Sequence, residues 1–271
     1  MRGRVLIVAG SDSGGGAGIQ ADIKTVTMLD AYAATAVTAL TAQNTLGVFG
    51  VLPIPPDFIR RQIEVVLDDI GADAVKCGML HSAAVIETVV GVLDERLEGA
   101  PLVVDPVMAA KGGARLIEAD AIAALKRRLI PRAAVLTPNL PEAEILAGAP
   151  IGDITAMRRA GEQLLALGCR AVVIKGGHLA GPVVTDLLAA DAAVRVWQSP
   201  RIDTRHTHGT GCTLASAIAA GLAQGLAIER AVDRARCFVR RAMATAPGFG
   251  HGHGPLDHAH PLRPSDGKAD G

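Results

Sequence analysis

The sequence predicts an α/β fold with a mainly parallel central sheet and helices on both of its faces. Short β-branched runs alternate with amphipathic segments of helix length, the pattern of repeated strand-helix-strand units. Hydrophobic residues make up 49% of the 271 residues but aromatic residues only 2%, so Ala, Val, Leu and Ile must build the core, as in buried parallel strands. No linker or charge run divides the chain. We therefore expect one domain over residues 1–262 and a disordered tail over residues 263–271.

The expected elements follow one another in a regular order. Strands are predicted at residues 4–9, 74–76, 102–105, 133–137 and 171–175. Helices are predicted between and after them, at residues 17–30, 57–69, 82–97, 119–129, 140–147, 155–167, 210–224 and 228–244. Residues 34–54 are predicted to add strands near an edge or lid, and residues 183–189 and 193–198 to form a hairpin around Ala190 and Asp191.

Composition excludes several classes of partner. Lys plus Arg (27) equal Asp plus Glu (27), so no basic excess is available for nucleic acid or an acidic membrane surface. The long uncharged stretches at 31–56 and 209–228 are interrupted by polar residues and glycines, which favours a protein interior over a membrane span. Residues 5–9 are too short for a signal-peptide core, and the four cysteines form no C-x-x-C pattern. We expect a cytoplasmic protein with reduced thiols and small-molecule partners.

Polar residues cluster where the predicted strands end. Lys76, Asp105 and Lys175 close their strands, and Asn139 and Glu142 follow the strand at 133–137. In an open parallel sheet the carboxyl ends of the strands face one rim, and ligands bind in the crevice there. Each residue alone is more often a helix cap or a solvated strand end, but their shared placement favours a common anionic ligand.

The hexapeptide from His208 to Thr213 places two glycines and a thiol at the start of a long uncharged helix. Unpaired N–H groups and positive potential at a helix N-terminus suit a phosphoryl group and lower the pKa of a thiol. This pattern indicates phosphoryl transfer involving Cys212. A glycine turn before a buried helix, with a cysteine that only packs, fits the hexapeptide equally well by itself.

The glycine-rich loop at residues 11–18 has no Walker A sequence. Residues 16–21 satisfy the loose form G-x-G-x-x-A, yet the acidic residue expected about twenty positions later is missing. A nicotinamide-dependent oxidoreductase is therefore a distant alternative. The glycines could let the backbone approach a flat substrate closely, or could form an ordinary strand-to-helix turn.

Several segments taken together resemble the hydroxymethylpyrimidine/phosphomethylpyrimidine kinases of thiamine biosynthesis, within the ribokinase-like superfamily. The matching segments run in order at residues 9–22, 41–45, 76–80, 105–108, 111–113, 136–144, 175–178, 207–212 and 250–255. The resemblance implies a ribokinase-like, homodimeric, ATP-dependent kinase. It would phosphorylate 4-amino-5-hydroxymethyl-2-methylpyrimidine and then its monophosphate. A pyridoxal kinase of the same superfamily is the nearest alternative, and a non-enzymatic binding module would leave the strand-end charges unexplained.

The resemblance also assigns roles around ATP. Asp105 and Glu142 would hold the Mg²⁺ that bridges the ATP phosphates, which hard oxygen ligands suit. Asn139 would support them, and Lys175 would neutralise charge near the transferring phosphate. The remaining expected contacts come from one loop. An anion hole would be formed by the backbone N–H groups of Gly209, Thr210, Gly211 and Cys212. The nucleotide would be contacted by Thr207, His208 and Gly209.

In the superfamily that this chain resembles, most members have an aspartate at the position of Cys212, and it acts as the base. The pyrimidine kinases have a cysteine there. A free thiol has a pKa of about 8.5, so we expect the helix start, a lysine and Mg²⁺ to stabilise its thiolate.

For the substrate, the Gln43 amide complements an aminopyrimidine edge, although a strand-end glutamine can also bond backbone. The resemblance adds Gly10, Asp22 and Met79 as ring or hydroxymethyl contacts. Met79 could equally be core, and Asp22 a solvated residue in a first helical turn.

The sequence near the C-terminus, from Gly250 to Gly254 with His258 and His260, could be mistaken for a metal site. It has no accompanying acidic or cysteine ligands, and the kinases it resembles carry a similar tail near the nucleotide. We therefore assign no zinc to it. His206, in the segment that leads to His208, departs from the family pattern. This departure bears on which substrate is bound more than on which reaction is catalysed.

Overall fold

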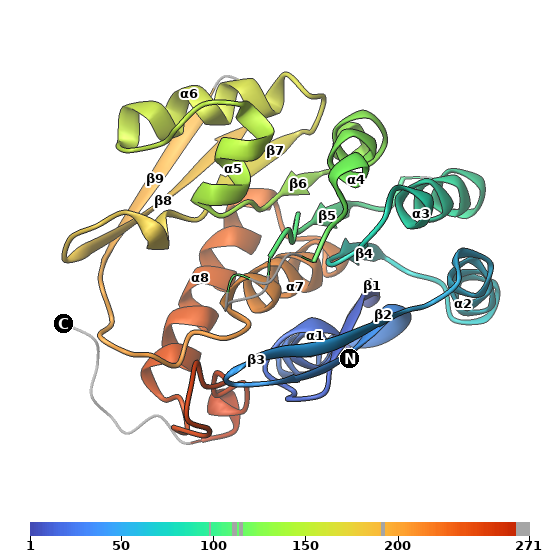
Figure 1. Ribbon diagram of the computed structural model, residues 1–271, viewed down its shortest axis with the longest axis horizontal. Helices are drawn as coiled ribbons and strands as arrows, with labels where there is room; N and C mark the ends of the chain where they lie inside the picture. Colours follow the sequence, from blue (N-terminus) through green and yellow to red (C-terminus); the bar gives the residue numbers. More distant parts are fainter. Residues whose placement is uncertain (98, 110–112, 114–115, 191–192, 264–271) are drawn as a thin grey trace.

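The computed structural model describes residues 1–97, 99–109, 113, 116–190 and 193–263. These residues contain a nine-stranded sheet with the order β3-β2-β1-β4-β5-β6-β7-β8-β9 (Figure 1). The strands are β1 (Arg4–Asp12), β2 (Tyr32–Asn44), β3 (Gly47–Pro53), β4 (Ala74–Cys77), β5 (Leu102–Val104), β6 (Val135–Leu136), β7 (Ala171–Ile174), β8 (Val183–Ala190) and β9 (Ala193–Pro200). Neighbours from β2 to β7 pair in parallel, whereas β3 and β8 pair antiparallel with their neighbours. The mainly parallel sheet and both edge hairpins are confirmed.

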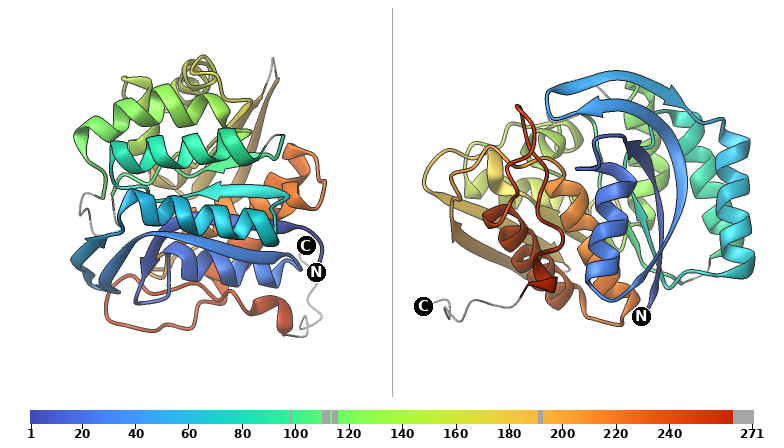
Figure 2. Two further views of the ribbon diagram at one scale, coloured as in Figure 1. Left: turned by 90° about the vertical axis from the view of Figure 1, so that its right-hand side faces the viewer. Right: turned by 90° about the horizontal axis from the view of Figure 1, so that it is seen from below.

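Helices cover both faces of this sheet (Figures 1 and 2). One face carries α2 (Pro56–Asp69), α3 (Ala83–Arg96), α4 (Ala119–Ala124), α5 (Leu140–Ala147) and α6 (Ile154–Leu165). The other face carries α1 (Gly18–Met28), α7 (Thr210–Ala223) and α8 (Ile228–Ala244). This three-layer arrangement confirms the α/β class.

Burial of β1 on both faces explains its continuous apolar sequence. Leu6 and Val8 pack among the helices of the α2–α6 face, while Val5, Ile7 and Ala9 pack against α1 and α7. Each of these side chains is at most 1% exposed. Side chains alternate between the faces of a strand, so a strand covered on both sides needs apolar residues at every position.

The glycines near the C-terminus serve a close approach between two chain segments. The N–H of His253 donates to the carbonyl oxygen of Thr45 at 2.9 Å, in the turn between β2 and β3. A Cβ on Gly250 or Gly252 would overlap Thr45 atoms. The Gly-His repeat therefore lays an extended segment across the β2–β3 turn, which requires residues without side chains at the contact points.

One predicted helix differs from the structure. The expected helix at 119–129 is α-helical only over α4 and continues as a π-helical turn over Leu125–Leu129 and a 3-10 turn over Ile130–Arg132. Pro131 lies in that last turn, and proline disrupts helical hydrogen bonding because it lacks an N–H. No helix in the described part of the chain is long and apolar enough to cross a membrane. Lys111 and Gly112 of the resemblance, Asp191 of the hairpin, and residues 264–271 of the expected tail lie outside the described residues.

His258 joins the C-terminal segment to α7 and gives the fold a dependence on pH. Its Nε2 lies 2.9 Å from Thr213 Oγ1, and the residue is 5% exposed. Burial lowers the pKa of His258 from 6.5 to about 4, because the charged ring would lose its hydration. The folded protein therefore holds this ring neutral at pH values where the unfolded chain would protonate it.

We predict that the free energy of unfolding falls as pH is lowered from about 6.5 to about 4. The unfolded state binds the His258 proton more tightly across this window, so protonation favours unfolding, by at most about 3 kcal/mol from this one group. Urea unfolding at a series of pH values should show a smaller loss for His258→Gln than for the parent. Equal losses in both proteins would contradict this assignment.

Candidate active site

A cavity of about 1020 Å³ opens at the rim where the parallel strands end. Loops after β1, β4, β5, β6 and β7 line it together with the start of α7. Nearly all the predicted site residues border this cavity: Gly10, Gln43, Met79, Asp105, Asn139, Glu142, Lys175, Thr207, His208, Gly209, Thr210, Gly211 and Cys212. The expected convergence of strand-end charges with the start of α7 is thus present in the structure.

Lys175 and two carboxylates form the charged end of the cavity. Lys175 Nζ lies 2.9 Å from Asp105 Oδ1 and 4.0 Å from Glu142 Oε2. Burial alone would lower the pKa of Lys175, but the two carboxylates raise it above its ordinary value. Burial raises the pKa of Glu142 to about 7, with Lys175 opposing and Asp105 adding to that rise. The cluster therefore holds a lysine cation beside one strongly buried carboxyl group that protonates near neutrality.

A helix cap fixes the position of Glu142. The Glu142 N–H donates to Asn139 Oδ1 at 2.9 Å, and the Asn139 N–H donates to Glu142 Oε2 at 2.8 Å. This reciprocal capping box starts α5 directly after β6. The two readings of these residues, helix cap and ligand site, are therefore compatible: the cap holds the carboxylate at the rim.

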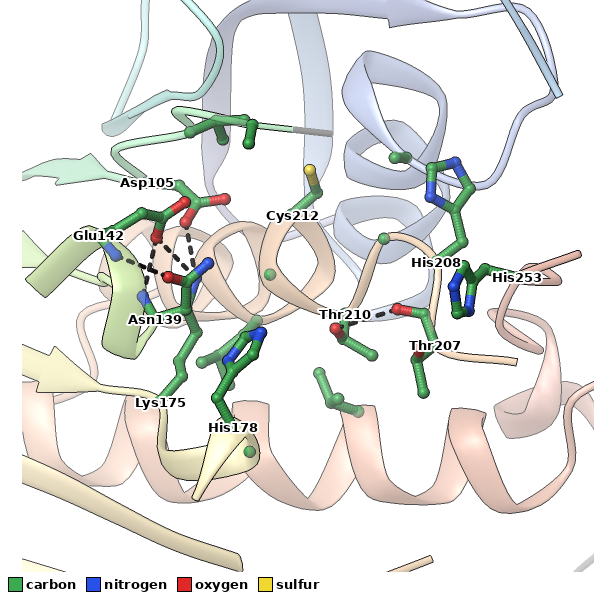
Figure 3. A pocket seen from close by; sticks show the side chains of 18 of the residues that line it. Asp105, Asn139, Glu142, Lys175, His178, Thr207, His208, Thr210, Cys212 and His253 are labelled. Carbon is green, nitrogen blue, oxygen red and sulfur yellow. Dashed lines mark hydrogen bonds and ion pairs between the residues drawn. The ribbon is translucent and has the colours of Figure 1, made fainter. Parts of the chain in front are cut away.

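The start of α7 forms a cradle of backbone N–H groups opposite this cluster. Gly209 precedes the helix with φ +83°, and a Cβ there would overlap the carbonyl oxygen of Gly16. A Cβ on Gly211 would lie 3.1 Å from Lys175 Nζ, so the first turn of α7 runs close to the lysine. N–H groups in the first turn of a helix lack internal acceptors and attract anions. Figure 3 shows Cys212 between this turn and the cluster of Asp105, Glu142 and Lys175.

The Cys212 thiol lies between the beginnings of two helices. Cys212 is in the first turn of α7 and is partly exposed, and the backbone N–H of Gly18, the first residue of α1, contacts its thiol. Burial nevertheless raises the pKa of Cys212 to about 12; Lys76 opposes this rise, while Asp22 and Asp105 add to it. Lys76 and the Gly18 N–H by themselves do not outweigh burial and the two carboxylates. The expectation that helix start, lysine and Mg²⁺ together stabilise the thiolate stays a prediction.

Asp22 does not lie where a substrate contact requires. It is fully buried and does not border the cavity. Its carboxylate accepts from Lys76 Nζ at 2.7 Å and from Ser216 Oγ at 2.6 Å. Both sequence interpretations of Asp22, a substrate contact and a solvated first-turn residue, are corrected by this burial. Lys76 borders the cavity where Asp22 was expected. Its position in a short, otherwise apolar strand is the sequence feature that could have indicated a functional lysine.

Gln43 meets His208 instead of the backbone alone. His208 Nε2 lies 2.8 Å from Asp12 Oδ2 and 3.0 Å from Gln43 Nε2. The Asp12 carboxylate also accepts from the N–H groups of Gly14, Gly16 and Ala17. Burial opposes ionisation of Asp12, but His208 and these N–H groups hold its pKa below the usual value. His208 thus connects the glycine-rich loop, the expected substrate contact Gln43 and the loop before α7.

Met79 is a core residue that also reaches the cavity, and its role as a substrate contact stays a prediction. It is 7% exposed and packs in a small apolar cluster with Ala39 and Leu116. It also borders the cavity, with its thioether and terminal methyl 3.4 Å from the point where Gly10 would carry a Cβ. Met79 and Gly10 thus lie side by side in the cavity wall, too close for a ring to enter between them.

This fold and this site define a phosphotransferase of the ribokinase-like class, in which a sheet rim and a helix N-terminus face each other across one cavity. Comparison with known families identifies the particular group. The family model described as phosphomethylpyrimidine kinase matches residues 12–257. The chain belongs to the phosphomethylpyrimidine kinase family.

Individual relatives agree with this assignment. The chain is 49% identical over 256 residues to the hydroxymethylpyrimidine/phosphomethylpyrimidine kinase of Bacillus subtilis, covering 94% of each chain. It is 52% identical to the thiamine biosynthesis bifunctional protein ThiED of Geobacter sulfurreducens, over 95% of this chain but only 52% of that longer relative.

Solved structures are similar over most of the chain. The pyridoxal kinase of Bacillus subtilis in an ADP complex has a TM-score of 0.89 at 37% identity, covering 96% of this chain and 98% of the other. The phosphomethylpyrimidine kinase of Clostridium difficile has a TM-score of 0.79 at 42% identity, covering 88% and 98%.

We predict that Gly209→Ala destabilises the protein far more than Gly225→Ala. Both glycines flank α7 with nearly equal φ, +83° and +81°, but only the Gly209 site has atoms where the new Cβ would lie. The backbone conformation alone costs an alanine about 1 kcal/mol, and the overlap with Gly16 adds to this at Gly209. Urea unfolding of both variants measures the difference. Equal destabilisation would contradict the close approach of the two loops.

Proposed function

We propose that this protein transfers the γ-phosphoryl group of ATP to 4-amino-5-hydroxymethyl-2-methylpyrimidine and then to the resulting monophosphate, giving the pyrophosphate used in thiamine assembly. One observation carries the proposal: the Lys175, Asp105 and Glu142 cluster faces the α7 cradle across the cavity that Gln43 and Met79 also line. Relatives at 42–49% identity are named hydroxymethylpyrimidine/phosphomethylpyrimidine kinase, which supports the substrate class.

The cradle and Lys175 would act on the transferring phosphoryl group. Phosphoryl transfer involves little covalent chemistry by the protein, so positioning and electrostatic stabilisation supply most of the rate. The N–H groups from Gly209 to Cys212 would stabilise the charge on the phosphoryl oxygens, and Lys175 would neutralise charge at the leaving side. Asn139, Thr207 and His208 line the same cavity and would contact the nucleotide.

Asp105 and Glu142 have the donor chemistry for Mg²⁺. Mg²⁺ binds through one or two carboxylates plus substrate phosphates and water. No group of three or more His, Cys, Asp or Glu side chains within the described residues could hold a metal alone, which fits an ion that arrives with the ATP phosphates. When bound there, Mg²⁺ would neutralise phosphate charge.

Gln43 and Met79 would recognise the pyrimidine. A side-chain amide offers a donor and an acceptor side by side, which matches the aminopyrimidine edge. The Gln43 amide lies next to His208, which in turn contacts Asp12 and so connects it to the glycine-rich loop; this holds the amide at the cavity before the ring binds. Gly10 and Met79 lie side by side in the cavity wall, where both would contact the ring.

Cys212 would act as the base in the first step. Its sulfur would accept the hydroxyl proton while the new O–P bond forms and the bond between the γ-phosphorus and the bridging oxygen of ADP breaks. The second step transfers to a phosphate oxygen, which carries no proton that must be removed. The first step would therefore need Cys212 as a base, and the second step would not.

The structure also bears on assembly and location. We propose a homodimer in which a second copy covers the open edge at β3, where the exposed apolar side chains of Leu46, Phe49 and Leu52 gather. A cytoplasmic location remains our proposal. All four cysteines are free thiols, which suits a reducing compartment.

Two alternatives have less support. The pyridoxal kinases that resemble this chain in structure are 34–37% identical to it, lower than the named pyrimidine kinases. The nicotinamide-dependent oxidoreductase depends on the loose match at residues 16–21, and membership of a kinase family leaves that match without support.

The direct experiment incubates the protein with Mg²⁺, ATP and equal concentrations of the pyrimidine alcohol and pyridoxal. We expect the pyrimidine monophosphate to appear first and the pyrophosphate later, both identified by mass, with ADP formed in equal amount. Pyridoxal phosphate as the main product would assign the chain to the alternative kinase. Absence of both products would contradict the proposal.

We predict that Cys212→Ala lowers turnover of the alcohol at least about a hundredfold, the usual contribution of a positioned base, and lowers turnover of the monophosphate much less. ATP affinity should change little, because the cradle uses backbone N–H groups. Cys237→Ala is the matched control, since Cys237 is exposed on α8. Near-normal turnover of the alcohol by Cys212→Ala would show that Cys212 is not the base.

A further inference from the structure

Lys76 and Asp22 form a fully buried ion pair directly below Cys212 that no role above uses. Their side chains are both 0% exposed, and Lys76 Nζ lies 2.7 Å from Asp22 Oδ2. Removing two charges from water is expensive, and buried ion pairs often stabilise a fold no better than apolar residues of similar size. Stability alone therefore does not account for this pair at the bottom of the active cavity.

Three elements hold the ammonium group in place. Lys76 comes from β4, Asp22 from α1, and Ser216 from α7, where its hydroxyl donates to Asp22 Oδ1 at 2.6 Å. Ser216 follows Cys212 by one helical turn, so both side chains lie on the same side of α7. A Cβ on Gly78 would lie 2.9 Å from Lys76 Nζ, which shows how closely the ammonium group is enclosed.

The ammonium group stands on the cavity side of the pair. Lys76 borders the cavity, whereas Asp22 does not. Asp22 is bonded to Ser216, one helical turn from Cys212, and Lys76 acts on the thiol more strongly than Asp22 does. Replacing Lys76 would change the field at Cys212 without removing any group that contacts ATP in the proposed function.

We infer that Lys76 is a positioning residue whose ammonium charge, held below Cys212 by Asp22 and Ser216, favours the thiolate form of Cys212. The inference rests on the proposed function only for its catalytic consequence. The effect of the Lys76 charge on the Cys212 thiol does not depend on which substrate the enzyme uses. As base, the thiolate would take the substrate hydroxyl proton, and the resulting S–H would later lose that proton to water while Lys76 stays protonated throughout.

Other charged groups around Cys212 act in known directions. Asp22 from α1 and Asp105 after β5 raise the pKa of the thiol, and Lys76 lowers it. Cys212 also interacts with Lys175, which follows β7, and this interaction helps to raise the pKa of Lys175. Burial alone would lower the pKa of Lys76, but Asp22, Cys212 and Asp105 raise it above its ordinary value. These neighbours therefore favour the charged form of Lys76.

Alkylation of the thiol tests this inference without ATP or pyrimidine. In a Cys237→Ser background, the rate of Cys212 reaction with iodoacetamide at pH 8 to 9 is proportional to the small thiolate fraction. The double variant Lys76→Met with Asp22→Asn replaces the pair by neutral residues and avoids an unpaired buried charge. We expect its Cys212 to react about tenfold more slowly, the effect of about one pKa unit from a neighbouring charge. A Cys212→Ser variant gives the background rate of the other thiols.

Two comparisons separate charge from packing. Lys76→Arg with Asp22 retained keeps a cation that does not lose its proton, so Cys212 should react at nearly the parent rate. The control Arg4→Met with Asp73→Asn neutralises the ion pair at the other end of β1 and β4 and should leave the rate unchanged. An unchanged rate in the Lys76 double variant would overturn the inference. So would an equal slowing by Lys76→Arg. If the double variant does not fold, Lys76→Gln alone takes its place in the same comparison.

Discussion

The parallel run of strands from β2 to β7 is the constraint on which the site depends. Because these strands point the same way, the residues that follow them must emerge at one rim. Lys76, Asp105, Asn139 and Lys175 are far apart in sequence, yet they border one cavity. The first turn of α7 lies against that rim, and a Cβ on Gly211 would lie only 3.1 Å from Lys175 Nζ. A fold that reversed any one of these strands would separate the charges from the cradle.

Buried charge is arranged around this rim in separate pairs with distinct surroundings. Lys175 lies beside Asp105 and Glu142, His208 beside Asp12, and Lys76 beside Asp22. Each pair is expensive to bury, so each must be satisfied by further hydrogen bonds. Asp12 and Asp22 meet that condition through backbone N–H groups and Ser216. The cavity therefore keeps fixed charges in place before any ligand binds, which is the condition for electrostatic catalysis.

Much of the fold could be predicted from the sequence because its signals are local or periodic. The short apolar strands, the helices between them and both edge hairpins follow from hydrophobic pattern and turn residues, and the convergence at the rim follows from strand direction alone. The break in the helix after Ala124 was missed, since apolar spacing continues through Leu129 while Pro131 ends the regular hydrogen bonds.

The details of the site were less predictable because they depend on which side chains meet across the fold. The partnership of Lys76 with Asp22 joins residues 54 positions apart, and no local pattern indicates that a first-turn aspartate faces inward. The thiol pKa was also beyond sequence reasoning. A helix start and a lysine suggest a lowered value, but the burial of Cys212 and the nearness of Asp105 decide the direction. His208 was predicted as a nucleotide contact, and its link to Gln43 required the spatial approach of residues 165 apart.

The most direct measurement of this account is a crystal structure with Mg²⁺, a non-hydrolysable ATP analogue and the pyrimidine alcohol bound together. The account predicts the terminal phosphate within hydrogen-bond distance of the N–H groups at the start of α7 and of Lys175. The pyrimidine hydroxymethyl oxygen should lie between that phosphate and the Cys212 sulfur. A phosphate chain bound away from the α7 turn, or a pyrimidine whose hydroxyl points away from it, would contradict the central claim that strand ends and helix start form one phosphoryl-transfer site.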